Sequence, residues 1–190
     1  MLSASTLLID NDHQKWFVMS AYRQEKKAEA ELLARGLKCF VPKRYVVKTL
    51  NGKKFRTLHP VVPNLVFLYA SWNEVIALKK SIEYLQFQTR VIQQKRQVMT
   101  IPDKEMEQFM LVAHQVEQEL VYYRPEELCV SGGEHVRVVG GSFNGVEGRL
   151  LKVAGKRQKR VVIEIEGLLA LAVTVESPEY IEIIHNEGGI

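Results

Sequence analysis

The stretch KWFVMSAYRQEKKAEAELLARG, residues 15–36, contains one strand signal, one helix signal and one stop signal. Its first seven residues form an aromatic and β-branched run that predicts a buried strand. From about Arg23, Ala28, Leu32 and Leu33 lie on one side of a helix whose other side is charged. Gly36 ends this helix, because glycine commonly follows the last helical turn. The stretch therefore predicts a strand followed by an amphipathic helix.

A basic hairpin is expected next. Cys39 to Val41 predicts a short strand that Pro42 stops, and Asn51-Gly52 then lies between two strand-like runs, 44–50 and 53–59. Asn-Gly is the strongest short-range hairpin signal, because both turn positions need a positive φ.

Two more helices are expected downstream. Leu65 to Ala70 predicts a strand, and Asn73 is the expected cap of a short helix that runs to Lys80. Ile101-Pro102-Asp103 opens a longer helix with a one-sided apolar stripe of Met106, Phe109, Met110, Ala113, Val116 and Leu120. This order of elements predicts a ferredoxin-like α/β sandwich, with helices on one sheet face.

The pattern changes after Leu120. Residues 122–132 include Pro125 and show no periodicity, so they predict a linker. From His135 onward every segment resembles a short strand; the five are HVRVV, GRLLKV, KRVVIEI, LALAVTV and YIEII. Short strands at this density predict a small, strongly bent five-stranded β-barrel. The expected fold class is therefore α+β, in two domains.

The net charge of +4 is unevenly distributed along the chain. Residues 15–96 contain 17 Lys or Arg and 5 Asp or Glu, a local balance of +12, and the remainder is net acidic. A polyanion is the simplest partner to propose for such a basic half. A solvated surface with an uneven share of lysine explains the same excess equally well.

The sequence disfavours several classes of protein. The longest uncharged apolar stretch, 61–72, is shorter than the roughly 20 residues that a membrane helix needs, and we expect no signal peptide. Cys39 and Cys129 lie too far apart in sequence to indicate a disulfide framework or a metal pair, so the cytoplasm is the expected compartment. Glycine-loop, nucleophile-elbow and metal-ligand patterns are missing. We therefore expect no enzyme and no cofactor.

Four motifs within residues 15–121 resemble the NusG family. Trp16-Phe17-Val18 precedes the first helix, and Cys39-Phe40-Val41-Pro42 precedes the hairpin. Pro60 to Phe67 and Ile101-Pro102-Asp103-Lys104-Glu105 follow in the family's order and spacing. Housekeeping NusG usually has two aromatics and Pro-Gly where this chain has Val61-Val62-Pro63-Asn64. Pro-Asn there is more like the specialised RfaH and UpxY paralogues.

The second half resembles a KOW domain. Gly133 to Val138 and then Gly141-Ser142-Phe143-Asn144-Gly145-Val146-Glu147-Gly148 look like a strand, a tight glycine turn and a glycine at which the next strand bends. The resemblance implies a NusG N-terminal (NGN) domain over 15–121, a linker over 122–132 and a KOW domain over 133–190.

The resemblance implies a transcription elongation and antitermination factor that binds RNA polymerase. Family members lie across the polymerase cleft, between the clamp helices and the gate loop, and disfavour paused states. The surface toward the clamp helices would include Tyr22, Val61, Val62, Pro63, Asn64 and Leu65; for Val62 and Leu65, ordinary core is the other interpretation. The gate-loop contact would fall near Ala77, Leu78 and Lys79, where this chain lacks the His-Thr-Thr run of RfaH.

Further partners follow from the basic residues and from the second domain. Lys26, Lys27, Arg35, Lys53, Lys54 and Arg56 either contact upstream or non-template DNA through phosphates or form a solubilising surface. KOW domains of the family recruit a small-subunit ribosomal protein or the termination factor Rho. The corresponding residues here, Ile165, Glu166 and Leu168, lack the family's aromatic and arginine, which disfavours that recruitment. The basic loop 156–160 could bind RNA or another acidic partner instead, but it is more simply a charged hairpin tip. We expect a monomer with no membrane partner.

A second hypothesis is a KOW-containing protein that binds ribosomal or other structured RNA. It explains the basic half and the barrel, but it does not explain Trp16 together with Pro63-Asn64. Co-purification with RNA polymerase or with ribosomal particles distinguishes the two hypotheses.

Overall fold

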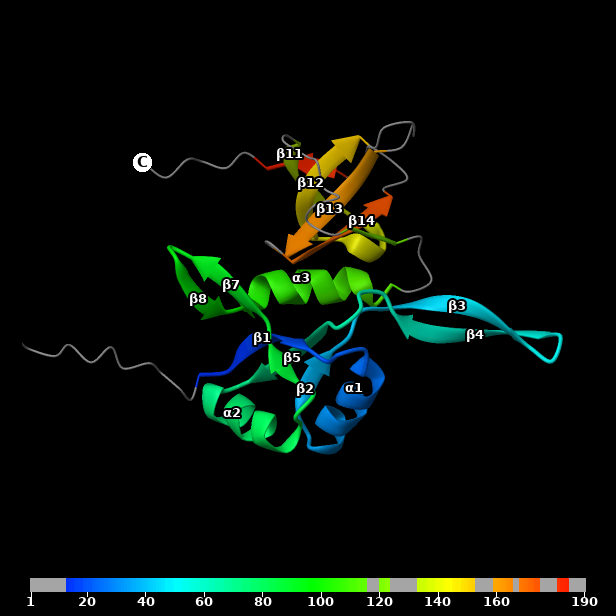
Figure 1. The fold of residues 1–190 in the computed structure, drawn as a ribbon. Coiled ribbons are helices and arrows are strands. Elements are labelled where there is room, and N and C mark those ends of the chain that lie inside the picture. Colours follow the sequence, from blue (N-terminus) through cyan, green and yellow to red (C-terminus); the bar gives the residue numbers. More distant parts are fainter. Residues whose placement is uncertain are drawn as a thin grey trace, which may run out of the picture. The chain divides into compact units, whose positions relative to one another are not determined.

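The structure, a computed structural model, describes residues 13–115, 120–123, 133–152, 159–165, 168–174 and 181–184 (Figure 1). The chain divides into two compact units. The first unit comprises Met1–Val41 and Pro63–Ile101, and the second comprises Pro42–Val62 and Pro102–Ile190. The described residues form a mixed α/β protein with three α-helices.

An antiparallel five-stranded sheet forms the centre of the first unit. Its strands are β1 (Lys15–Ser20), β2 (Lys38–Phe40), β5 (Val66–Ala70), β6 (Gln86–Phe87) and β9 (Thr100–Ile101). They pair in the order β2-β5-β1-β6, and β9 also pairs with β1. The helices α1 (Glu25–Ala34) and α2 (Trp72–Ser81) lie on the same face of this sheet (Figure 1).

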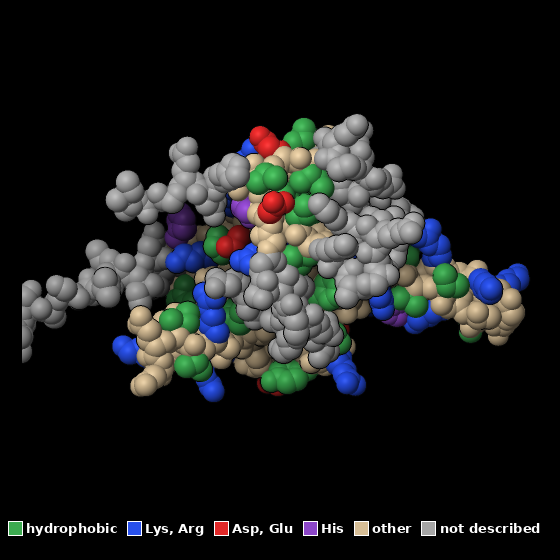
Figure 2. Space-filling model, turned by 90° about the horizontal axis from the view of Figure 1, so that it is seen from above, with side chains coloured by type: hydrophobic (Ala, Val, Ile, Leu, Met, Phe, Trp, Pro, Cys, Tyr) green, Lys and Arg blue, Asp and Glu red, His purple; other side chains and the backbone are tan. Residues whose placement is uncertain are grey.

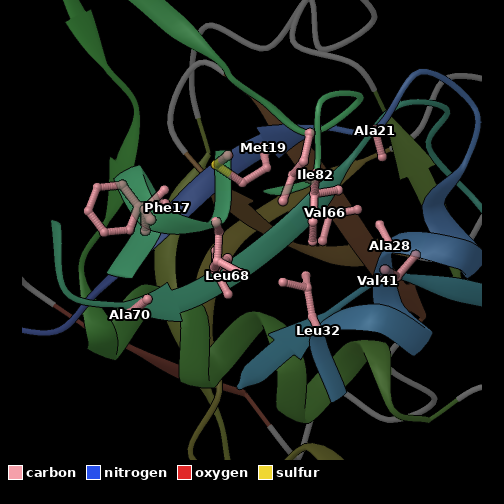
Figure 3. Close-up of a cluster of buried hydrophobic side chains, with 13 residues drawn as sticks. Phe17, Met19, Ala21, Ala28, Leu32, Val41, Val66, Leu68, Ala70 and Ile82 are labelled. Carbon is pink, nitrogen blue, oxygen red and sulfur yellow. The ribbon is translucent and has the colours of Figure 1, made fainter. Parts of the chain in front are cut away.

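The core of the first unit lies between the sheet and these helices. Phe17 and Met19 of β1 and Val66 and Leu68 of β5 point into it (Figure 3), and Leu32 of α1 packs against them. The opposite sheet face is also buried, because Trp16 and Val18 are 1% and 0% exposed. Burial on both faces explains why β1 is a continuous apolar run instead of an alternating one. The predicted strand and helix are confirmed, but Leu33, expected on the apolar side, is 58% exposed.

The predicted cap of α2 is wrong. Ser71 caps the helix, because its hydroxyl accepts a hydrogen bond from the Glu74 backbone N–H while the Glu74 carboxylate accepts one from the Ser71 N–H at 2.7 Å. This reciprocal capping box satisfies two backbone donors. Asn73 lies inside the first turn and is exposed.

A second hairpin in the first unit was not predicted. It consists of β7 (Thr89–Ile92) and β8 (Lys95–Val98). Gln93 and Gln94 form the turn at φ 48° and 62°. Such turns usually carry Asn-Gly, so Gln-Gln gave no turn signal in the sequence.

The predicted basic hairpin is confirmed in the second unit. It consists of β3 (Lys43–Leu50) and β4 (Lys53–Pro60), and Leu50 pairs with Lys53 across the turn. Asn51 and Gly52 have φ 51° and 76°, as the Asn-Gly signal requires.

The remainder of the second unit is a helix and a six-stranded sheet. The strands are β10 (Val121–Tyr123), β11 (Glu134–Val138), β12 (Glu147–Lys152), β13 (Lys159–Ile165), β14 (Leu169–Thr174) and β15 (Ile181–Ile183). They pair in the order β10-β14-β13-β12-β11-β15, and a short 3-10 helix, η2 (Gly141–Phe143), precedes β12. All five strands predicted from His135 onward are present. The sixth, β10, includes Tyr122 and Tyr123, the first residues of the expected linker.

Helix α3 (Asp103–Ala113) lies against β13 and β14. Met106, Phe109 and Ala113 of the predicted stripe are buried, and so is Val112, which was not predicted. Leu120 lies beyond the helix, and Val116 lies outside the described residues. Within the sheet, a Cβ at Gly148 would lie 2.4 Å from the Val162 carbonyl oxygen, so β12 requires a glycine at its closest approach to β13.

Candidate functional site

A hydrogen-bonded junction in the first unit holds the turn between β1 and α1. Tyr22 and Arg23 have φ 46° and 64°, an uncommon conformation for side chains of this size. The Arg23 backbone N–H donates to Asn64 Oδ1 at 2.6 Å, and the Asn64 N–H donates to the carboxylate of the buried Glu25. Asn64 itself has φ 65°. We call these three contacting residues, Arg23, Glu25 and Asn64, the Asn64 clasp.

The clasp positions an exposed aromatic ring. Tyr22 is 61% exposed, so most of its ring faces solvent. Pro63 is also exposed and directly precedes Asn64. An exposed tyrosine offers a protein partner a large amphipathic contact area at a low cost in conformational entropy.

The other expected clamp-facing residues lie in different environments. Leu65 is 1% exposed, so its side chain belongs to the interior. Val61 and Val62, in the second unit, are half-buried, and the Val61 N–H donates to the Pro42 carbonyl at 2.9 Å. Val62 therefore keeps part of its side chain accessible.

The expected gate-loop residues lie on α2. Ala77 is exposed, whereas Leu78 is buried against the core of the first unit. The Lys79 ammonium lies 4.7 Å from the centre of the Phe87 ring, which stacks on Trp72 at 5.3 Å. Lys79 therefore makes a cation–π contact with Phe87 within the protein, whether or not it also contacts RNA polymerase.

The basic residues of α1 differ in how much they are engaged. Lys26 is exposed. Lys27 lies 3.9 Å from Glu31 and 4.7 Å from the Tyr84 ring centre, and Arg35 donates to Ser81 Oγ at 3.0 Å. Lys26 is therefore the least committed of the three.

The β3–β4 hairpin presents cations on both faces, as its strand register shows; Figure 2 shows Lys and Arg side chains along the hairpin, at the right. Lys53 pairs with Leu50 on one face, while Lys54 and Arg56 pair with Thr49 and Val47 on the other. Paired residues share a face, so the charge is divided between the two. The Arg56 guanidinium lies 4.2 Å from the Tyr45 ring centre. Exposed apolar residues, Val47, Leu50 and Phe55, interleave with the cations.

In the six-stranded sheet, the expected partner residues lie at the β13–β14 turn. Ile165 is buried, and the Leu168 N–H donates to its carbonyl at 3.0 Å; Leu168 is half-buried. Glu166 lies outside the described residues.

Arg160, expected in an exposed hairpin tip, is 3% exposed in β13 and donates to Tyr123 Oη at 3.4 Å. The rest of that basic loop, 156–158, lies outside the described residues.

A charged network that the sequence did not reveal connects α3 with the six-stranded sheet. Glu147 accepts from Arg137 at 2.8 Å and lies 3.4 Å from Lys104 Nζ, and Arg137 also contacts Glu182 at 3.5 Å. The hydrogen bond from Arg137, and then Lys104, hold the pKa of Glu147 below its usual value. Lys104 and Glu147 also line a polar pocket of about 600 Å³. Their sequence separation explains why the network could not be predicted.

Neither a metal site nor a membrane-spanning helix is present in the described part of the chain. It contains no group of three His, Cys, Asp or Glu side chains that could hold a metal ion. Helices there are too short or too polar to span a bilayer.

The family of the chain follows from comparison with family models. Residues 14–110, half of the chain, match the NusG model, described as transcription termination factor NusG. The chain belongs to the NusG family. A solved Thermotoga maritima NusG, from a study of its domain interaction, is 20% identical; the similarity covers 91% of this chain and 98% of that one, at a TM-score of 0.44. The search of curated proteins found no match.

The NusG match includes most of the candidate residues. Tyr22, the Asn64 clasp, α2 and both hairpins lie within 14–110, whereas Ile165 and Leu168 lie beyond it. Family membership therefore supports a general role in transcription for the candidate residues within 14–110. It gives no information about Ile165 and Leu168. The charged network extends past the matched region as well, because Arg137 and Glu147 follow residue 110.

Proposed function

We propose that this NusG-family protein is a specialised elongation and antitermination factor that binds RNA polymerase across its main cleft. It consists of a ferredoxin-like NGN domain over 15–121, a linker over 122–132 and a KOW β-barrel over 133–190. Family membership and the Pro63-Asn64 pair support this assignment. The factor acts in the cytoplasm as a monomer.

The observation that carries the proposal is the exposed Tyr22 ring beside the Asn64 clasp. The Arg23–Asn64 hydrogen bond connects a turn after β1 to the segment before β5, and Tyr22 and Pro63 directly precede the two bonded residues. Because Tyr22 is 61% exposed, packing of the protein core does not account for an aromatic residue at this position. Aromatic residues are enriched among the few that dominate protein–protein binding energy. In this proposal Tyr22 and Pro63 contact the clamp helices.

The proposed mechanism involves no catalysis. A factor that binds the closed, elongating polymerase more tightly than the paused form shifts the population toward elongation by the difference in binding free energy. Contacts on both sides of the cleft are enough to produce this preference for the closed form. Tyr22 and Pro63 contact the clamp helices on one side, and Ala77 and Lys79 of α2 contact the gate loop on the other. Lys26 and the β3–β4 hairpin contact upstream or non-template DNA, which adds salt-sensitive affinity.

Binding of the full chain to RNA polymerase tests the proposal. Tyr22→Ala should weaken binding by about thirtyfold or more, since hot-spot truncations cost about 2 kcal/mol or more. Leu33→Ala is the matched control, because Leu33 is an apolar residue of the same unit with nearly the same exposure, 58% against 61%. It should bind as the wild type does.

The same preparations distinguish the two functional hypotheses. The wild-type chain should co-purify with RNA polymerase and reduce pausing and termination in transcription with purified components. Recovery of ribosomal particles without polymerase would support the RNA-binding hypothesis instead. Equal loss of polymerase binding by the Tyr22 and Leu33 variants would refute the assigned surface.

A further inference from the structure

The β7–β8 hairpin is a basic ribbon to which the proposed function assigns no role. Its sequence, TRVIQQKRQV over 89–98, contains Arg90, Lys95 and Arg96 but no acidic and no aromatic residue. The side chains of all three cations are exposed. The apolar side chain of Val91 is 70% exposed as well. No ion pair of these cations occurs within the described residues. Their charge is therefore available to a partner.

The strand register distributes the charge over both faces. Val91 pairs with Arg96, whereas Arg90 pairs with Gln97 and Ile92 with Lys95. Paired residues share a face and neighbours along a strand alternate, so Arg96 lies on one face and Arg90 and Lys95 lie on the other. A ribbon that binds a flat acidic surface needs cations on only one of its two faces. Cations on both faces suit a groove with negative charge on both walls.

The turn ends the ribbon with two exposed amides. Gln93 and Gln94 both adopt positive φ, which a side chain with a Cβ rarely does. The turn therefore holds two residues in an uncommon backbone conformation, and both of their carboxamide side chains are exposed at the tip of the ribbon. Glutamine amides can donate to and accept from base edges in the major groove of DNA.

We propose that the β7–β8 ribbon enters the major groove of B-form duplex DNA. That groove is about 12 Å wide and admits a two-stranded β-ribbon, and phosphates line both of its walls. Single-stranded nucleic acid is disfavoured because the ribbon has no aromatic ring on which bases could stack. Duplex RNA is disfavoured because its major groove is deep and narrow. The ribbon differs in this from the β3–β4 hairpin, which carries Tyr45 and Phe55.

Binding of the full chain to a short DNA duplex, without polymerase, tests the proposal at several salt concentrations. The variant Arg90→Gln/Lys95→Gln/Arg96→Gln should bind more weakly, and its plot of log K against log salt should be shallower by about 0.9 per lost phosphate contact, about 2–3 in total. Arg96→Gln alone should change the slope by about 0.9. The variant Arg90→Lys/Arg96→Lys keeps the charge and should keep the slope.

Two controls separate a site from bulk charge. Lys15→Gln/Lys80→Gln removes exposed cations of the same unit outside the ribbon and should leave the slope unchanged. Matched RNA duplex and single-stranded DNA should show smaller differences between wild type and triple variant. Parallel salt plots on DNA, no measurable wild-type binding, or an equal slope change on the RNA duplex would each overturn the proposal. None of these results depends on polymerase binding, so the proposed function is tested separately.

Discussion

Replacing Asn64 by alanine tests whether the clasp holds the turn that carries Tyr22. The substitution removes the Oδ1 atom that accepts from the Arg23 N–H at 2.6 Å. It also puts an ordinary Cβ residue at φ 65°, which asparagine tolerates better than alanine. The hydrogen bond to Glu25 survives, because it comes from the Asn64 backbone N–H. Two separable effects are therefore expected.

Their sizes can be worked out from these contacts. A hydrogen bond of this kind contributes about 0.5–1.5 kcal/mol, and the left-handed backbone costs alanine about 1–2 kcal/mol, so Asn64→Ala should lower the free energy of unfolding by about 1.5–3.5 kcal/mol. Asn64→Gly loses the same hydrogen bond but adopts positive φ freely, and its added chain entropy costs only about 0.4–1 kcal/mol. The alanine variant should therefore be less stable than the glycine variant by roughly 1 kcal/mol.

Urea unfolding followed by tryptophan fluorescence measures both changes. The sequence has two tryptophans, Trp16 and Trp72, and both lie in the first unit with Asn64, so the signal reports on that unit. Free energies come from linear extrapolation at constant slope. Equal midpoints for the alanine and glycine variants would show that the backbone effect is absent. Wild-type midpoints for both would show that the clasp does not form in solution.

Three further outcomes are expected. Val62→Asp should weaken polymerase binding by about 2–5 kcal/mol, because the charge would be desolvated without a partner, while the cooperative melt persists; a lost melt would place Val62 in the core. Lys53→Gln/Lys54→Gln/Arg56→Gln should keep the fold and reduce the salt slope for an assembled elongation complex by about 2–3, and parallel plots would remove DNA binding from this hairpin. Glu147→Gln should be less stable than wild type near neutral pH, measured by thermal melts. Because the pKa of Glu147 is lowered in the folded state, the difference should disappear as the pH falls below the ordinary value of 4.5, and a constant difference would contradict the charge pairing.

Elements with a local signal could be predicted from the sequence. The strand at 15–20, the Asn51-Gly52 hairpin, the helix from Asp103 and the five strands from His135 onward each follow from short-range periodicity or turn chemistry. The family could also be predicted, because its motifs are contiguous runs. These features require no knowledge of which distant segments meet.

Features that depend on tertiary contacts could not be predicted. The exposure of Leu33 has a local cause instead, because each residue of a helix is rotated by about 100° and this separates Leu33 from the buried Leu32. Arg160 belongs both to the predicted strand KRVVIEI and to the basic run 156–160, and the burial of its side chain follows only once β13 pairs with β12 and β14. The Gln93-Gln94 turn contradicts its local preference, and only the pairing of β7 with β8 reveals it.

Asn64 combines a backbone conformation that favours glycine with a side chain that glycine lacks. The resemblance drawn from the sequence sets Pro63-Asn64 against the Pro-Gly that is usual in housekeeping NusG, and the φ of 65° here is one that glycine adopts freely. Asparagine is among the few other residues that tolerate this conformation, so the turn persists. Its side chain adds what glycine lacks, an acceptor for the Arg23 N–H beside Tyr22. The Asn64→Gly variant recreates the housekeeping pair. If the clasp serves to present Tyr22, that variant should lose polymerase affinity even though its backbone is unstrained, whereas a purely conformational role for Asn64 predicts unchanged affinity.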